Sequence, residues 1–198
     1  MDPNVVVSRL VRLIRLDTSV FDEVRDDDRE LLPALVVAAA ACLLAGIGAW
    51  LYWQLIPSST PDDAFLNTVI FGTIFLVALY AVAILVTYVV MVQLFRIQAD
   101  LMALIRVLGY AAWPLGLSVL MFIPVIYPVF ALIPLCLLLV TMIFGAQSVA
   151  GGGDSRESVL ASLAGLAVMV LVLGLIGQSS DGFIPMGAGV FGVLIDLS

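Results

Sequence analysis

Residues that could act in catalysis, ligate a metal or bind phosphate are scarce in this sequence. Their spacing matches no known kind of catalytic or binding site. There is no His, so the chain offers no imidazole to haem, chlorophyll or a metal ion and no histidine base. Cys42 and Cys136 lie within apolar stretches, where we interpret them as small apolar side chains rather than a disulfide or redox pair. The triple glycine at 151–153 and the GxGxxG spacing at 187–192 lack the Lys or the βαβ unit that phosphate binding needs.

Carboxylates gather in one place only, within residues 22–30. Such a run could attract a basic partner or a divalent cation, but the more ordinary explanation is a solvated helix face. No basic patch supports nucleic-acid binding. We therefore predict a protein that is not an enzyme, with no catalytic residues, no cofactor and no metal site.

The composition indicates a membrane protein. Of the 198 residues, 63% are apolar and 12% are charged, whereas a soluble domain is about half apolar and about a quarter charged. The stretch 106–149 carries a single charge, at Arg106, and is too long for one membrane crossing. It fits two crossings joined by a turn at 123–128, where Pro124 and Pro128 interrupt the helix.

The whole chain predicts an all-α, polytopic membrane protein with five transmembrane helices and an N-terminal amphipathic helix. Residues 1–32 form cytoplasmic amphipathic helices, 33–177 form the membrane domain, and 178–198 form an extracytoplasmic apolar tail. The predicted spans are 33–55, 66–93, 107–123, 128–149 and 159–177.

The segment 4–16 is basic on one side and apolar on the other, and too short to span. We predict that it lies in the headgroup layer with Arg9, Arg12 and Arg15 facing anionic lipid. The alternative is a solvated helix that packs on its own protein.

Small residues mark two helix faces for close packing. Ala41, Ala45 and Ala49 recur every four residues in the first span, and Ala161 and Gly165 do so in the last. Tyr110 is typical of an interfacial anchor, and Pro134 should kink the fourth span.

The arginines give the predicted sidedness. The chain's basic residues are all Arg, and with five spans they fall on one side of the membrane. By the positive-inside rule the protein lies in the cell membrane with its N-terminus cytoplasmic and its C-terminus outside. The residues concerned are Arg9, Arg12, Arg15, Arg25, Arg29, Arg96, Arg106 and Arg156.

The opening of the third span resembles a known family. Arg106-Val107-Leu108-Gly109-Tyr110-Ala111-Ala112-Trp113-Pro114 is similar to the R-x-L-G-Y-x-x-x-P pattern of Yip-domain proteins, the Ypt/Rab-interacting membrane family. The resemblance implies five spans, a cytoplasmic N-terminus and Arg106, Gly109, Tyr110 and Pro114 as motif residues. Eukaryotic members are linked to Rab GTPases. Because this chain lacks their long N-terminal cytosolic region, it resembles the prokaryotic members, whose role is unassigned, and we do not transfer the Rab function.

The lack of a candidate catalytic, cofactor or metal site and the small-residue faces together favour a non-catalytic scaffold or accessory subunit of a larger membrane complex. Its expected partners are membrane lipids and other integral membrane subunits. The alternative is a channel or a small-molecule or lipid transporter without intramembrane charges, lined by hydroxyls and by carbonyls near Pro134. A membrane-shaping role is a third possibility.

Overall fold

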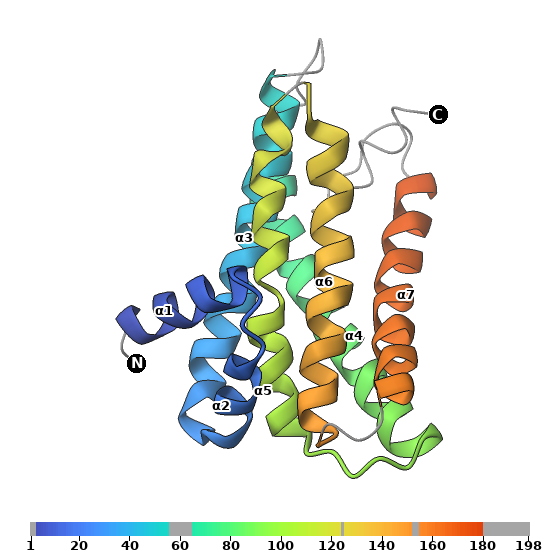
Figure 1. The fold of residues 1–198 in the computed structure, drawn as a ribbon. Helices are drawn as coiled ribbons and strands as arrows, with labels where there is room; N and C mark the ends of the chain where they lie inside the picture. The colour runs from blue at the N-terminus through green and yellow to red at the C-terminus, as the bar shows by residue number, and fades with distance from the viewer. Residues whose placement is uncertain (1–2, 56–64, 124, 152–154, 180–198) are drawn as a thin grey trace.

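The five predicted spans are present in the structure. The computed structural model describes residues 3–55, 65–123, 125–151 and 155–179, and every regular element within those ranges is a helix. Five of them are long and apolar enough to cross a membrane (Figure 1), which confirms the all-α, five-span architecture. The tail beyond Ser179 and residues 56–64, between the first two predicted spans, lie outside the described residues.

Two short helices precede the first span. The elements in order are α1 (Pro3–Ile14), α2 (Ser19–Asp26), a 3-10 turn (Asp28–Glu30) and α3 (Leu31–Leu55); α4 (Gly72–Val89), flanked by π-helical turns at Leu66–Phe71 and Val90–Leu94; α5 (Leu101–Ala111) and the 3-10 helix η4 (Trp113–Phe122); α6 (Tyr127–Val149); and α7 (Ser155–Ser179).

The helix of the third span, α5, begins earlier in the chain than the sequence analysis predicted. Asp100 caps it, because its carboxylate accepts the backbone N–H of Ala103 at 2.9 Å, and α5 therefore starts at Leu101 rather than near Val107. Arg106 consequently lies on the helix, within an apolar span that runs from Leu101 to Phe122. The predicted span 107–123 left Arg106 outside this helix, whereas the structure includes it.

The small-residue faces pack inside the molecule. Ala41, Ala45 and Ala49 of α3 are buried, and α3 makes its most extensive contact with η4. Gly48 lies so close to the backbone of Ser118 that a side-chain carbon would collide with its carbonyl. Close backbone approach of this kind is what small residues permit in membrane bundles.

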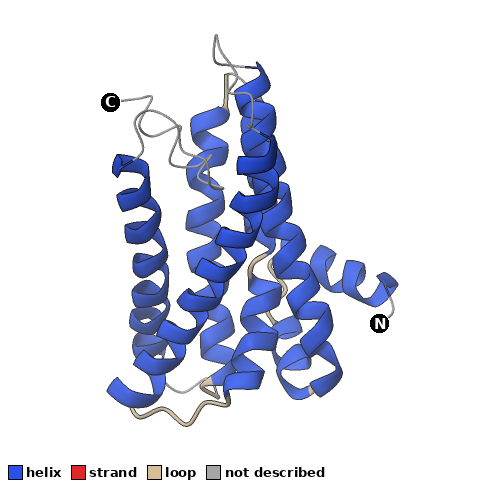
Figure 2. Ribbon diagram, turned by 180° about the vertical axis from the view of Figure 1, so that it is seen from behind, coloured by secondary structure: helices blue, strands red, loops and turns tan. Residues whose placement is uncertain are grey.

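The last helix shows the same behaviour. α7 packs against α4 and α6 (Figure 2), with Ala161 fully buried. A side chain at Gly165 would collide with Thr87 and with the carbonyl of Ala83 on α4. Both predicted faces therefore hold this chain's own helices together.

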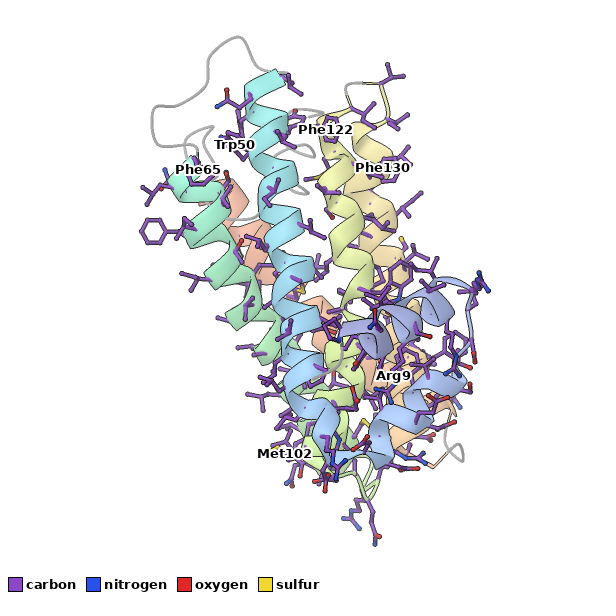
Figure 3. All side chains as sticks on the ribbon, turned by 90° about the vertical axis from the view of Figure 1, so that its left-hand side faces the viewer. Arg9, Trp50, Phe65, Met102, Phe122 and Phe130 are labelled. Carbon is purple, nitrogen blue, oxygen red and sulfur yellow. The ribbon has the colours of Figure 1, made fainter. Side chains whose placement is uncertain are left out.

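The two ends of the bundle differ in chemistry. Trp50, Phe65, Phe122 and Phe130 gather at one end, whereas Arg9 lies near the other (Figure 3); the Trp50 and Phe65 rings meet edge to face with centroids 5.5 Å apart. α2, the connection 95–100, the end of α6 and the start of α7 share the second end, and α1, which projects from the side of the bundle, is bound to α2. We call it the arginine end, because the arginines of the chain belong to these segments or, like Arg106, to the adjacent turns.

Candidate docking site at the arginine end

A group of four polar side chains joins α1 to α2, and we call it the α1 clasp: Arg12, Asp17, Ser19 and Glu23. The Arg12 guanidinium donates to both carboxylate oxygens of Glu23, at 3.0 and 2.7 Å, and to Asp17 at 2.8 Å. Asp17 also accepts the hydroxyl of Ser19 at 2.6 Å and its backbone N–H at 3.2 Å, so it supplies an acceptor to the first N–H group of α2. Planar, bidentate pairing of this kind fixes orientation.

We expect the α1 clasp to weaken only in acid. The Ser19 hydroxyl and then Arg12 hold the pKa of Asp17 below its ordinary value of 3.8. A carboxyl whose pKa is lower in the folded state stabilises the fold above its ordinary pKa and loses that contribution as the pH falls. Amide-exchange protection factors of α1 should therefore stay constant from neutral pH down to about pH 4 and fall below it. Asp17→Asn should lower protection at neutral pH and flatten that acid decline; an unchanged profile would contradict the assignment.

A buried triad fixes α1 to the third span. Arg9 pairs with one oxygen of Glu30 at 2.5 Å, and the hydroxyl of Tyr110 donates to the other at 2.7 Å. The side chains of Arg9 and Glu30 are only 13% and 11% exposed. Tyr110 itself is fully buried. Its predicted role as an interfacial anchor is therefore wrong, because the N-terminal helices cover it and Glu30 binds its hydroxyl.

Two arginines then cap two helix ends in series. Arg106 donates to the carbonyl of Arg25 in the last turn of α2, at 2.6 Å, and to Asp28 at 2.6 Å. Arg25 in turn donates to the carbonyl of Ser148 in the last turn of α6, at 2.6 Å. The last carbonyls of a helix lack partners within it and carry partial negative charge, so cations stabilise them. The series links α5, α2 and α6.

The other two motif residues serve packing. A side-chain carbon at Gly109 would come within 2.8 Å of the Ala34 carbonyl, so glycine lets α5 approach α3. Pro114 is buried in the first turn of η4, where the absent N–H costs nothing. Arg106, Gly109 and Tyr110 are spaced as one face of a helix, and this face receives the N-terminal helices and α3.

The three arginines predicted to face lipid headgroups have different surroundings. Arg9 and Arg12 are bound to this chain's own carboxylates. The bonds to Glu23 and Asp17 raise the pKa of Arg12. Arg15 alone of the three is exposed without an ion pair among the described residues. Contact of these residues with lipid stays a prediction.

A polar cleft opens between α2 and the end of α6. It has a volume of about 650 Å³. Two hydrogen bonds connect α2 and α6 across this cleft. The Ser148 hydroxyl donates to Asp22 at 2.6 Å, and Arg25 donates to the Ser148 carbonyl. The lining residues are Thr18, Asp22, Arg25, Phe144, Gln147, Ser148 and Gly151.

Within the described ranges, no three carboxylate or thiol groups converge as a metal ion would require. Both cysteines are free thiols, Cys42 buried and Cys136 exposed. The arrangement provides a shaped polar surface held against the bundle.

Sequence reasoning missed the partners of the motif. Glu30 stands directly before an apolar span, and Arg106 lies just inside another; a charge placed so deep needs a partner. The position of these two charges next to apolar spans indicated that each has a partner of opposite charge. It did not indicate which carboxylate pairs with which arginine.

Compared with protein-family models, with curated protein sequences and with solved structures, the chain has no match. The resemblance to the Yip domain therefore stays a prediction based on Arg106, Gly109, Tyr110 and Pro114.

Proposed function

We propose that this integral membrane protein is a non-catalytic scaffold or accessory subunit whose docking surface is the arginine end, on the cytoplasmic side. One observation carries the proposal: α2 is fixed to α5 and α6 by Arg106 and Arg25, each bonded to a helix-end carbonyl. A rigidly held surface loses little conformational entropy when a partner binds.

The surface has the properties of a docking site for a polar segment. The cleft lies between α2 and α6, and α2 carries exposed carboxylates, with the side chains of Asp22 and Asp26 58% and 67% exposed. The hydrogen bond from Arg25 keeps the pKa of Asp26 below its ordinary value, so it is charged at neutral pH. We propose a membrane subunit whose cytoplasmic segment is polar or basic as the partner.

The small-residue faces cannot serve this purpose, because they are buried against this chain's own helices. We therefore place the docking site at the arginine end rather than on the transmembrane faces. If the resemblance to the Yip domain holds, its motif serves to seat the N-terminal helices.

The test is purification from the native membrane in mild detergent, with quantification of every subunit that stays bound. Gln147→Trp fills the cleft, and we expect it to remove a stoichiometric partner that the wild type retains. Leu163→Trp is the matched control, because Leu163 faces outward from α7 and is 42% exposed; this variant should keep the partner.

Retention of the partner by Gln147→Trp would refute the cleft as the docking site. A homo-oligomer that carries only lipid would refute the accessory-subunit proposal and favour the transporter alternative. Solute flux in reconstituted vesicles, abolished by Pro134→Ala, is the measurement for that case.

A further inference from the structure

α1 has two apolar sectors with different environments. Val6 and Leu13 are buried against the protein. Val7, Val11 and Ile14 are 58%, 41% and 58% exposed, and their spacing of four and three residues places them along one face. No residue of the described ranges covers this second sector.

The charged side of α1 shows which way this strip faces. Val11 is two positions after Arg9, which corresponds to a rotation of about 200° around the helix axis. Arg9 and Arg12 are bound to Glu30 and Glu23, so α2 and the 3-10 turn lie on the side opposite the apolar strip. Figure 1 shows α1 running across the bundle and projecting from its side, with α2 beyond it toward the arginine end. The strip therefore faces away from the charged end of the molecule.

α1 is attached to the chain just before a surface that a membrane must cover. Leu32, Leu35 and Val36 of α3 are exposed, and they follow within two turns of Glu30, the residue that holds Arg9. In a helix that spans a bilayer, outward apolar side chains meet lipid. Because Arg9 is bonded to Glu30, α1 is held at the level where that surface begins.

We propose that α1 is an in-plane membrane anchor whose Val7, Val11 and Ile14 are buried among lipid chains, and that its attachment is apolar rather than electrostatic. Two of the three arginines that would bind anionic headgroups are bound within the protein. Lipid charge therefore has little influence on the position of α1. This inference concerns lipid and is independent of the docking proposal for α2.

The test is fluorescence of a polarity-sensitive nitrobenzoxadiazole label at Val11→Cys, with Cys42→Ala and Cys136→Ala in the same chain. The protein is reconstituted in vesicles of phosphatidylcholine with and without phosphatidylglycerol, and the control label is at the exposed Arg29→Cys in the 3-10 turn that follows α2. We expect the Val11 label to be blue-shifted, quenched by doxyl groups on lipid chains and shielded from iodide in both vesicle types. The Arg29 label should show the opposite response.

Three results would overturn the proposal. Equal iodide quenching at both positions would mean that the strip is solvated. Bismaleimide cross-linking between copies at position 11 would make a second protomer the occupant. Burial of the Val11 label only in vesicles with phosphatidylglycerol would show that charge, not apolar contact, holds α1 on the membrane.

Discussion

Glu30→Ala is expected to lower the free energy of unfolding by about 3–5 kcal/mol, the cost of removing one member of a buried ion pair. The substitution leaves Arg9 largely buried with a weaker, more distant pairing to Glu23 at 3.8 Å, and leaves the buried Tyr110 hydroxyl without its acceptor. The measurement is equilibrium unfolding in mixed detergent micelles.

The matched control for this change is Glu23→Ala. Glu23 also pairs with α1, but its side chain is 44% exposed, so we expect a loss below about 1 kcal/mol. Tyr110→Phe removes only the hydrogen bond to Glu30 and should cost about 1.5–3 kcal/mol, since that bond has a charged acceptor. Its effect should disappear in the Glu30→Ala background, where the acceptor is already gone. Equal losses for Glu30→Ala and Glu23→Ala would contradict the role assigned to the triad.

Gly48→Ala should have an effect of similar size for a different reason. A single added carbon would collide with the carbonyl of Ser118 and with the Cα of Val119, and backbone cannot move aside as a flexible side chain can. Overpacking typically costs about 1–3 kcal/mol and more where relief is difficult, so we expect a loss of about 3 kcal/mol in the same unfolding assay.

Gly174→Ala is the control for that substitution. Among the described residues, no atom beyond the adjacent turns of α7 lies within 4 Å of a side-chain carbon built at Gly174, so alanine should be neutral or stabilise the helix by up to about 1 kcal/mol. If both variants unfolded alike, the loss would reflect glycine chemistry in general and not the α3–η4 contact.

The spans were predictable because hydropathy follows from composition over some twenty residues. The beginning of α5 was not predicted, although Asp100 three residues before Ala103 has the spacing of a helix cap. Tyr110 was misplaced for a physical reason: tyrosine suits a membrane interface and a buried hydrogen bond equally well. Only the position of Glu30 next to the Tyr110 hydroxyl distinguishes the buried environment from the interfacial one.

The candidate site depends on pairings over long sequence distances. Asp28 and Arg106 are separated by 78 residues, and no local pattern selects that partner among the many carboxylates of residues 22–30. The small-residue spacing was informative about close packing but silent about which helix would be the neighbour. Ala41 and Gly165 therefore proved to be internal contacts, and the exposed polar surface appeared elsewhere.

The distance between bonded partners along the chain sets an order of events during biosynthesis. Val20, Phe21 and Val24 are buried in the finished protein, yet the Tyr110 that binds Glu30 is made 80 residues later and the Ser148 that binds Arg25 is made 123 residues later than its partner. Translation proceeds from the N-terminus, so α1 and α2 emerge from the ribosome before their binding surface exists. The first helices to be synthesised thus cannot complete their contacts until the third and fourth spans have been made.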